Sequence, residues 1–441
     1  MKGARSTARH RASTFSTTIP IYALPPSTGT TYYVDAVNGN DSNNGLAAGS
    51  GHAWATLQKA ANTIAAGSTV LVYNGTYSNS GGDVMALSGK NGSASNWTVI
   101  RAAPGQSPVV QGGSAAYAAG FHTTSSSYVC IAGFTVNGFS QSLTQSGAFA
   151  AGGGGQYTNN GILFGQQLSG GYDSHHLQVL NCTVSNWPGG GIQFSFCDYC
   201  TVQGCMVFNN AYYAVYQNSG ISLWELHNFD NAAGFHNVIN GNILYGNQIF
   251  VGPSGTSATG VTDGEGLIID DNQNTESDNV AYTSTTLISN NIAYGNGRCG
   301  LETDRSNNCT VIYNTSYLND VTPTGNLGYP PSLEFSQYNA QNNTIFNNIF
   351  YATSGHGYID NSGTTTGSTW GYNITYNGTG TAPGSNNITS NPNFASTTTF
   401  TLNAGSPAIG AAVLSYTVAK DIYGNPRPGA NGTSIGAVEY L

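Results

Sequence analysis

The feature that most restricts the fold of this chain is an irregular repeat in its second half. Asparagine followed three residues later by tyrosine occurs as NILY at Asn242, NIAY at Asn291, NTSY at Asn314, NIFY at Asn348 and NITY at Asn373. The two shortest steps between successive asparagines are 23 and 25 residues. A coil of that length, lengthened in places by inserted loops, explains all the steps.

Short β-branched and aromatic segments at this period, with asparagine at a turn and stacked tyrosine, predict a right-handed parallel β-helix. Such a solenoid stacks its coils about 4.8 Å apart, so Asn242, Asn291 and Asn314 should form hydrogen bonds along the stack. The composition agrees, because 59 glycines and only 7% charged residues leave few helix-forming residues. We therefore predict an all-β, single-domain β-helix over residues 31–441, preceded at 1–30 by a flexible leader or export-signal remnant.

Charge and hydropathy exclude two classes of partner. The formal net charge is −9, and four of the eleven basic residues lie in the first eleven positions, which argues against nucleic-acid binding. No apolar run approaches the ~20 residues of a membrane span. The seven cysteines include Cys197, Cys200 and Cys205, but no convincing fourth metal ligand accompanies these three. We expect buried thiols, with or without one disulfide.

The end of a solenoid must be covered so that its last strands do not pair with another molecule. The segment HAWATLQKAANTIAAGSTVLVYNGTY places Trp54, Leu57, Ala61 and Ile64 on one face of an amphipathic helix, followed by a strand. We predict that this helix caps the N-terminal end.

Two longer segments carry a family resemblance. YYVDAVNGNDSNNG with AWATLQKAANTIAAGSTVLVYNGTY resembles the first segment of many secreted, carbohydrate-active parallel β-helix proteins of the pectate-lyase-like superfamily. SPAIGAAV with DIYGNPRPGANGTSIGAVEYL is similar to their closing segment. The resemblance implies a secreted or cell-surface protein with a polysaccharide or oligosaccharide partner, which we expect to act as a monomer. The superfamily contains lyases, hydrolases, epimerases and proteins without known activity, so the resemblance implies the fold more than the chemistry.

One strand of each coil can be aligned on a small residue followed by alternating apolar positions. The segments are GIQFS from Gly191, GISLWE from Gly220, GLIIDD from Gly266, GLETDR from Gly300 and SLEFSQ from Ser332. The first and third positions after the small residue should point inward, and the second and fourth outward. One outward column then contains Gln193, Ser222, Ile268, Glu302 and Glu334, and the other contains Ser195, Trp224, Asp270, Asp304 and Ser336.

This alignment gathers Asp270, Glu302, Asp304 and Glu334 into one outward acidic patch. Like charges stacked on neighbouring strands destabilise a sheet, so the patch indicates a functional site rather than a solvated face. Long insertions around these coils point the same way, since binding sites concentrate in loops on rigid scaffolds. The candidate substrate-binding residues are Trp224, Tyr212, Tyr213, Tyr282, Glu334, Asp271 and Arg305.

Paired carboxylates favour a glycoside hydrolase. Retaining enzymes hold the two groups about 5–5.5 Å apart and inverting enzymes about 6.5–9.5 Å apart. Asp270 stacked on Asp304 suits the first spacing, and Asp270 diagonal to Glu302 suits the second. The layout GLIIDD followed by GLETD also resembles that of β-helical β-xylosidases, which implies Asp270 as nucleophile and Glu302 as acid. We expect such a hydrolase to need no cofactor.

Two alternatives remain open. A polysaccharide lyase or epimerase would act on a uronate polymer, with Ca²⁺ held by Asp263, Asp270 and Asp271 and with Arg298 or Arg305 as base. No lysine lies between positions 90 and 420, so a lysine base is absent from this region. A non-catalytic glycan-binding β-helix would keep aromatic platforms but would not need paired carboxylates.

Overall fold

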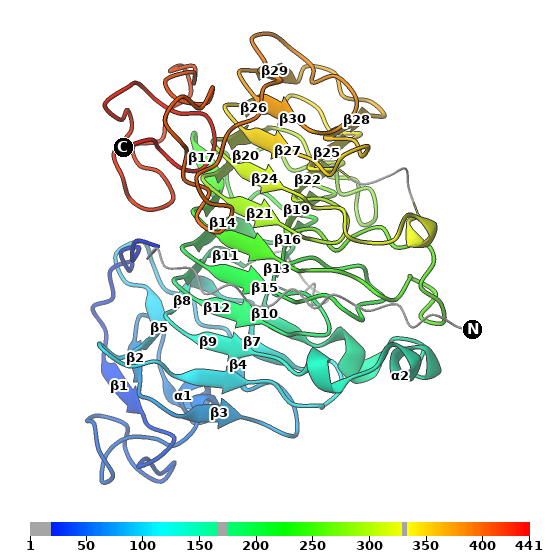
Figure 1. The fold of residues 1–441 in the computed structure, drawn as a ribbon. Coiled ribbons are helices and arrows are strands. Elements are labelled where there is room, and N and C mark those ends of the chain that lie inside the picture. The colour runs from blue at the N-terminus through cyan, green and yellow to red at the C-terminus, as the bar shows by residue number, and fades with distance from the viewer. Residues whose placement is uncertain (1–18, 166–173, 329–332) are drawn as a thin grey trace.

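The computed structural model describes residues 19–165, 174–328 and 333–441, and it is a right-handed parallel β-helix (Figure 1). Each coil contributes one short strand to each of three parallel sheets, which we call A, B and C in chain order. The predicted fold class is confirmed.

Sheet A contains eleven strands: β1 Thr31–Val34, β2 Thr69–Val72, β5 Thr98–Ala102, β8 Ser127–Ala132, β11 His175–Leu180, β14 Asp198–Gln203, β17 Phe235–Asn240, β20 Thr285–Ser289, β23 Cys309–Ile312, β26 Thr344–Phe346 and β29 Thr369–Gly371. Sheet B contains ten: β3 Thr76–Ser78, β6 Val109–Gln111, β9 Thr135–Asn137, β12 Thr183–Ser185, β15 Met206–Phe208, β18 Ile243–Tyr245, β21 Ile292–Tyr294, β24 Thr315–Tyr317, β27 Ile349–Tyr351 and β30 Ile374–Tyr376. Sheet C contains nine: β4 Met85–Ser88, β7 Ala119–Thr124, β10 Asn160–Phe164, β13 Ile192–Ser195, β16 Ile221–Trp224, β19 Leu267–Asp270, β22 Leu301–Asp304, β25 Phe335–Tyr338 and β28 Ile359–Ser362.

The asparagine repeat forms the predicted ladder at the turn between sheets A and B. The Nδ2 of Asn242 donates to Oδ1 of Asn291 at 2.9 Å, and Asn291 donates in the same way to Asn314 at 3.0 Å. The ladder continues through Asn348 to Asn373. These amides are fully buried, so each one satisfies polar groups that the interior would otherwise leave without partners.

A second ladder occupies the turn between sheets B and C. Asn210, Asn247, Asn296 and Asn319 stack in the same manner, and Asn319 Nδ2 donates to Glu334 Oε2 at 2.7 Å. Each of these asparagines lies five residues after the first residue of a repeat, so the sequence carried a signal for this ladder as well.

The first coil is capped as predicted. Helix α1 covers Leu57–Thr63, and the side chain of Thr56 caps its N-terminus by accepting from the Lys59 amide. Trp54, Leu57 and Ile64 are each at most 2% exposed, because they pack into the core that the inner faces of the three sheets share.

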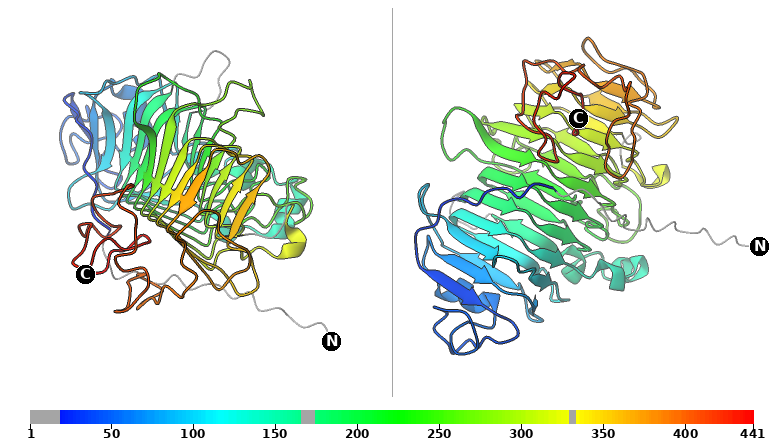
Figure 2. Two further views of the ribbon diagram at one scale, coloured as in Figure 1. Left: turned by 90° about the horizontal axis from the view of Figure 1, so that it is seen from above. Right: turned by 60° about the vertical axis from the view of Figure 1, so that its left-hand side comes forward.

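Residues 377–441 follow the last strand, β30, and lie along the side of the β-helix (Figures 1 and 2). Phe400 and Val438 pack there against Tyr245 and Tyr294 on the outer face of sheet B. This closing segment therefore covers one sheet.

Residues 19–30 are the described part of the predicted leader. Residues 19–30 lie against the outside of the helix, where the Tyr22 amide donates to Asn181 and its hydroxyl accepts from Asn240. Residues 1–18 lie outside the described residues.

All seven cysteines are buried and free, which confirms the expectation of buried thiols. Cys182 and Cys205 occupy the position of the ladder asparagines in the two preceding coils. The Cys205 amide donates to Asn242 Oδ1 at 2.9 Å, which joins these cysteines to the asparagine ladder between sheets A and B. The remaining short helices are α2 Gln145–Ala150, η1 Ser140–Ser142, η2 Gly155–Thr158 and η3 Thr324–Asn326. In the part of the chain that the structure describes, no helix has the length and apolar character needed to cross a membrane.

The predicted register of sheet C is correct through β22 and wrong at β25. Ile221, Leu267 and Leu301 pair in register as expected, but the partner of Leu301 is Phe335 and not Leu333. Residue polarity alternates with a period of two, so a shift by two residues preserves the inward and outward faces and cannot be detected from alternation. As a result Ser336, not Glu334, stacks on Glu302.

Candidate functional site

Four residues form a row along the outer face of sheet C. Trp224, Asp270, Asp304 and Tyr338 end the successive strands β16, β19, β22 and β25 and pair in register. In-register strands lie about 4.8 Å apart, so the two carboxylates stack directly between two aromatic rings. All four residues are half-buried, with the side chain of Asp270 21% and that of Asp304 18% exposed. We call these residues the Trp–Asp–Asp–Tyr row.

Arg305 joins the two carboxylates of the row. Its Nε donates to Asp304 Oδ2 at 2.7 Å, while its Nη2 lies 3.5 Å from Asp270 Oδ1. Its Nη1 donates to Glu276 Oε1 at 2.8 Å. The guanidinium is therefore closer to Asp304 than to Asp270, which makes the two carboxylates electrostatically unequal.

Both carboxylates of the row have raised pKa values. Burial and the neighbouring Glu302 raise the pKa of Asp304 to about 6, although Arg305 opposes this shift. Burial and the Asp304 carboxylate raise the pKa of Asp270 well above its usual range. Stacked carboxylates titrate as a pair, so each one disfavours the ionisation of the other.

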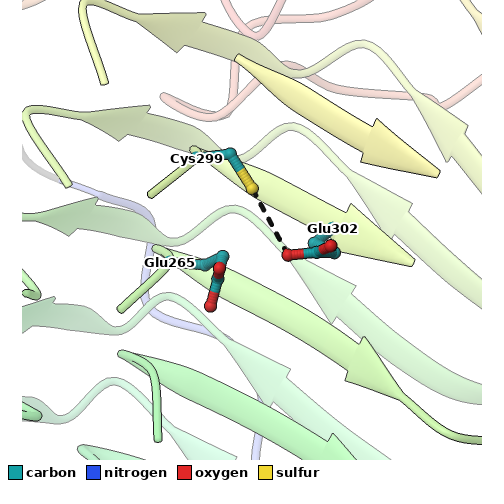
Figure 3. Close-up of side chains that lie close together, drawn as sticks. All are labelled: Glu265, Cys299 and Glu302. Atoms are coloured by element: carbon teal, nitrogen blue, oxygen red, sulfur yellow. Dashed lines mark hydrogen bonds between the residues drawn. The ribbon is translucent and has the colours of Figure 1, made fainter. Parts of the chain in front are cut away.

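A second charged group lies at the start of strands β19 and β22, and Figure 3 shows two of its members, Glu265 and Glu302. Arg298 forms an ion pair with Glu302 and a second with Glu265, whose Oε1 lies 3.3 Å from Arg298 Nη1. Ser336 donates to Glu302 Oε1 at 2.8 Å, and both glutamates are fully buried. Burial, followed by the nearby Glu302, raises the pKa of Glu265 to about 8.

The burial of Glu302 corrects the predicted exposed patch. Glu302 lies on the outer face of sheet C, as expected, but side chains from the preceding turn cover it. Cys299, from that turn, donates its thiol to Glu302 Oε2 at 3.6 Å (Figure 3). Asp270 and Asp304 are thus the carboxylates of the patch that solvent reaches.

Glu265, Cys299 and Glu302 are also the described residues whose possible metal-ligand atoms lie within 4.8 Å of one another. Arg298 already contacts both carboxylates, so the guanidinium supplies the positive charge that a metal would provide. This donor set fits an ion-pair network better than a metal centre.

The residues suggested for Ca²⁺ in the lyase interpretation lie on different parts of one coil. Asp263 precedes β19 and accepts from the Thr262 hydroxyl. Asp270 ends that strand. Asp271 lies in the following turn, where its carboxylate accepts from the Thr275 hydroxyl and the Glu276 amide. A calcium site built from these three aspartates stays a prediction.

The three tyrosines suggested for substrate binding all have structural contacts. Tyr213 is buried in the inserted loops, where its hydroxyl donates to the Leu143 carbonyl. Tyr212 packs against Phe250 in the same loops. Tyr282 is 1% exposed and donates to Asp198.

Glu334, suggested as a further substrate contact, is 1% exposed and ends the second ladder. It accepts from the Ser316 hydroxyl as well as from Asn319. The alignment error at β25 placed Glu334 in the acidic patch and hid Tyr338, which occupies the end of the row.

Comparison with known proteins adds to the description of the fold. No protein-family model matches the chain, and no curated protein sequence matches it. The crystal structure of pectate lyase Pel9A aligns with a TM-score of 0.53 at 17% identity, over 94% of this chain and 98% of the other. The shared architecture thus extends over nearly the whole length of both proteins, which confirms the resemblance at the level of the fold.

Two further solved structures align less closely. The GH136 lacto-N-biosidase from Eubacterium ramulus has a TM-score of 0.44 at 12% identity, over 79% of this chain and 60% of the other. The alginate lyase from Paenibacillus sp. str. FPU-7 has a TM-score of 0.36 at 16% identity, over 70% and 94%.

Proposed function

We propose that this protein is a carbohydrate-active enzyme that cleaves glycosidic bonds, and specifically a glycoside hydrolase whose paired carboxylates are Asp270 and Asp304. The observation that carries the proposal is the Trp–Asp–Asp–Tyr row, in which two solvent-accessible carboxylates stack between two aromatic rings. A glycosidase needs a carboxyl pair at the scissile bond, and a sugar ring packs well on an aromatic face.

The unequal environments of the two carboxylates suggest their roles. Asp270, with its raised pKa, would give its proton to the glycosidic oxygen as the bond breaks. Asp304, held by Arg305, would attack the anomeric carbon and form a glycosyl ester. Water activated by the deprotonated Asp270 would then hydrolyse the ester. A separation near 4.8 Å suits this retaining route, for which about 5–5.5 Å is usual.

This assignment differs from the roles that the resemblance to β-xylosidases implied. Glu302 is fully buried against Arg298, so its carboxyl group would have to leave an ion pair to reach a glycosidic oxygen. Asp304 lies at the accessible position in the same strand.

Trp224 and Tyr338 suggest how a substrate would lie. They flank the carboxylates on either side along the stack of coils, so sugar units before and after the scissile bond would each meet a ring. We therefore propose a chain of sugars lying parallel to the axis of the β-helix.

Product analysis tests the reaction class. The purified protein is incubated with neutral and uronic polysaccharides, and both reducing ends and the ultraviolet absorbance of an unsaturated uronate are followed. Hydrolysis gives new reducing ends without the chromophore, and NMR of the first product should show a retained anomeric configuration. Cleavage that produces both signals would overturn the hydrolase in favour of a lyase. Binding without cleavage would favour the non-catalytic alternative.

Carboxamide variants test the residues. Asp270→Asn and Asp304→Asn should each lower turnover at least ~10²-fold, because each removes an acid–base or nucleophilic group. The matched control is Asp360→Asn, the same change on the same face of sheet C in β28, which should keep near-normal turnover. Near-normal turnover in both row variants would contradict the assignment of Asp270 and Asp304 as the catalytic pair, and Glu302 would then be the next residue to test.

One observation favours a lyase as the second candidate. Arg305 is a quarter exposed beside the row, where its guanidinium can neutralise a uronate carboxylate. The two activities respond differently to chelation, since a calcium-dependent lyase would lose activity in EDTA and recover it only with Ca²⁺. We expect turnover of the folded hydrolase to persist in chelator.

A further inference from the structure

Residues 19–30 cross the outer face of sheet A from β2 to β17 (Figure 2). At one end the Gly29 amide donates to the Gly67 carbonyl at 3.1 Å, just before β2 begins. At the other end the Tyr22 hydroxyl accepts from Asn240, the last residue of β17, at 2.9 Å. A coil of a solenoid normally contacts only its two neighbours. This segment therefore joins coils that the β-helix itself keeps apart.

The segment is bound as an extended chain with one face inward. Tyr22 and Leu24 are half-buried. Their neighbours Ile21 and Ala23 are exposed, Ile21 by 86%. Leu24 packs against the small apolar cluster around Trp97 on the outer face of sheet A. Alternating burial of this kind is the pattern of a strand that lies on a surface, which indicates specific docking of this segment.

From β8 onward, the residue directly after each strand of sheet A adopts a left-handed backbone conformation. We call these residues the turn column: Gly133, Asn181, Gly204, Gly241, Asn290, Tyr313, Asn347 and Tyr372. A Cβ atom on Gly241 would lie 2.3 Å from the Tyr22 hydroxyl, and one on Gly204 would lie 2.7 Å from the Tyr22 ring. The two glycines thus leave a slot that holds this tyrosine.

Two asparagines of the turn column bind a neighbouring segment in the same way. Oδ1 of Asn181 accepts from the Tyr22 amide at 2.9 Å, and its Nδ2 donates to the Tyr22 carbonyl at 3.1 Å. Asn347 makes the same pair of bonds to the amide and carbonyl of Val413 in the closing segment, at 2.9 and 3.0 Å. Both contacts involve only backbone atoms of the bound segment, as is usual where a surface binds an extended peptide. The turn column therefore recognises extended chain at two separate places.

The two bound segments meet between these places. A Cβ atom on Gly424 would lie 3.3 Å from the Pro20 ring, and Ile19 packs against the apolar cluster that includes Ile422. We propose that the turn column is a binding groove for an extended peptide segment, and that residues 19–30 occupy it as a latch between the early coils and the closing segment. Release of the latch should then loosen the part of the closing segment that it contacts.

Hydrogen–deuterium exchange of the full chain tests the latch without any polysaccharide. Tyr22→Ala removes the ring from its slot, so amide exchange in residues 19–30 should become at least about tenfold faster. Exchange in residues 419–427 should also become faster, because this part of the closing segment packs against the latch. The matched control is Ile21→Ala, a truncation of the neighbouring exposed side chain, which should leave both rates unchanged. Equal exchange rates in the wild-type protein and Tyr22→Ala would overturn the proposal.

A second pair of variants tests the slot itself. Gly241→Ala and Gly295→Ala place the same methyl group in a left-handed backbone conformation, since the φ angles are 69° and 59°. Only the methyl group at position 241 would meet Tyr22, whereas the one at 295 has no described atom within 4 Å. Gly241→Ala should therefore speed exchange in residues 19–30 and Gly295→Ala should not. Faster exchange in both variants, or in neither, would contradict the slot.

The same groove could be filled by residues 19–30 of a second molecule. The wild-type protein would then sediment as a dimer in analytical ultracentrifugation, and Tyr22→Ala would convert it to monomers. That result would overturn the latch in favour of exchange between two copies. We expect monomers for both proteins, as a latch within one chain requires. None of these measurements depends on the proposed hydrolysis.

Discussion

The outer faces of sheets B and C are built from the same coils but have different compositions. On sheet B, Tyr245 stacks on Tyr294 with ring centroids 5.0 Å apart, and Tyr317 contacts Tyr351 at 4.8 Å. The closing segment covers this column with apolar residues such as Phe400. On sheet C the corresponding column changes from coil to coil, and two of its members are acids.

The difference separates structural repetition from a candidate functional site. A residue type that recurs in every coil can be explained by the stacking of coils alone, as the tyrosines and the asparagine ladders are. Asp270 stacked on Asp304 works against stability, because both are half-buried carboxylates on neighbouring strands. Their raised pKa values are the physical sign of that cost. The following predictions test whether the two faces differ as described.

The largest expected effect on stability concerns charge compensation on sheet C. Arg298→Leu leaves Glu265 and Glu302 buried without their common partner, and it should lower the free energy of unfolding by about 3–5 kcal/mol. Denaturant unfolding at neutral pH measures this loss. Arg305→Leu, at a more exposed position, should cost no more than about 1 kcal/mol. Equal losses of unfolding free energy in the two variants would mean that burial does not determine how much each arginine contributes to stability.

A ladder variant should affect stability and leave turnover unchanged. Asn291→Leu removes the acceptor of Asn242 and the donor to Asn314, both fully buried, and should cost about 1–3 kcal/mol. The exposed Asn44→Leu serves as control and should stay within about 0.5 kcal/mol. If turnover of the folded Asn291 variant fell as far as turnover of an Asp270 variant, the structural role of the ladder could not be distinguished from the catalytic role proposed for the row.

The acids on the sheet C side should make stability depend on pH. The folded-state pKa values of Asp304, Glu334 and Glu265 are raised to about 6, 7 and 8. Unfolded carboxyl groups titrate near 3.9–4.3, so between about pH 4 and 8 the folded protein holds more protons. Stability is therefore greatest near pH 4 for these groups and falls as pH rises to about 8.

Thermal unfolding across this range checks the direction. Glu265→Gln should flatten the part of the profile between about pH 6 and 8, since it removes the group with the highest of these three values. A stability that rises throughout the range would contradict the assignment of raised pKa values.

The smallest effect is expected at the aromatic ends of the row. Trp224→Ala and Tyr338→Ala should each raise KM by up to about tenfold with little change in kcat, because stacking on a sugar is similar in the ground and transition states. Tyr376→Ala makes the same kind of change at a half-buried residue on the outer face of sheet B and should leave KM unchanged. Comparable KM shifts at Tyr376 and Tyr338 would remove the functional distinction between the two faces.

The sequence predicted those features that depend on periodicity. The spacing of Asn242, Asn291 and Asn314 indicated the coil, and alternation placed Asp270 and Asp304 on the outer face of adjacent strands. Alternation failed at β25, because it does not distinguish a strand beginning at Leu333 from one beginning at Phe335. The loop before β25 has no repeat of its own, and only the three-dimensional pairing sets its length.

The periodicity of the sequence could not predict which side chains are buried at the candidate site. Glu302 occupies an outward position, but Arg298 and Cys299 fold back over it from the preceding turn. Glu225 likewise follows a half-buried tryptophan, and it is buried although it lies at the end of an outward-facing segment. Such cover depends on loop conformation, which a pattern of apolar residues does not encode.

The second asparagine ladder gives the β-helix an electrostatic direction. Oδ1 of Asn296 accepts from both the backbone amide and Nδ2 of Asn247, and Asn319 repeats this arrangement toward Asn296. Every amide dipole in the ladder therefore points the same way, with its N–H groups toward the later coils. At the end of this array Glu334 accepts from the Asn319 side chain and backbone. An acid at the positive end of aligned dipoles is the arrangement that stabilises the N-terminus of an α-helix, here produced by side chains along the axis of a solenoid.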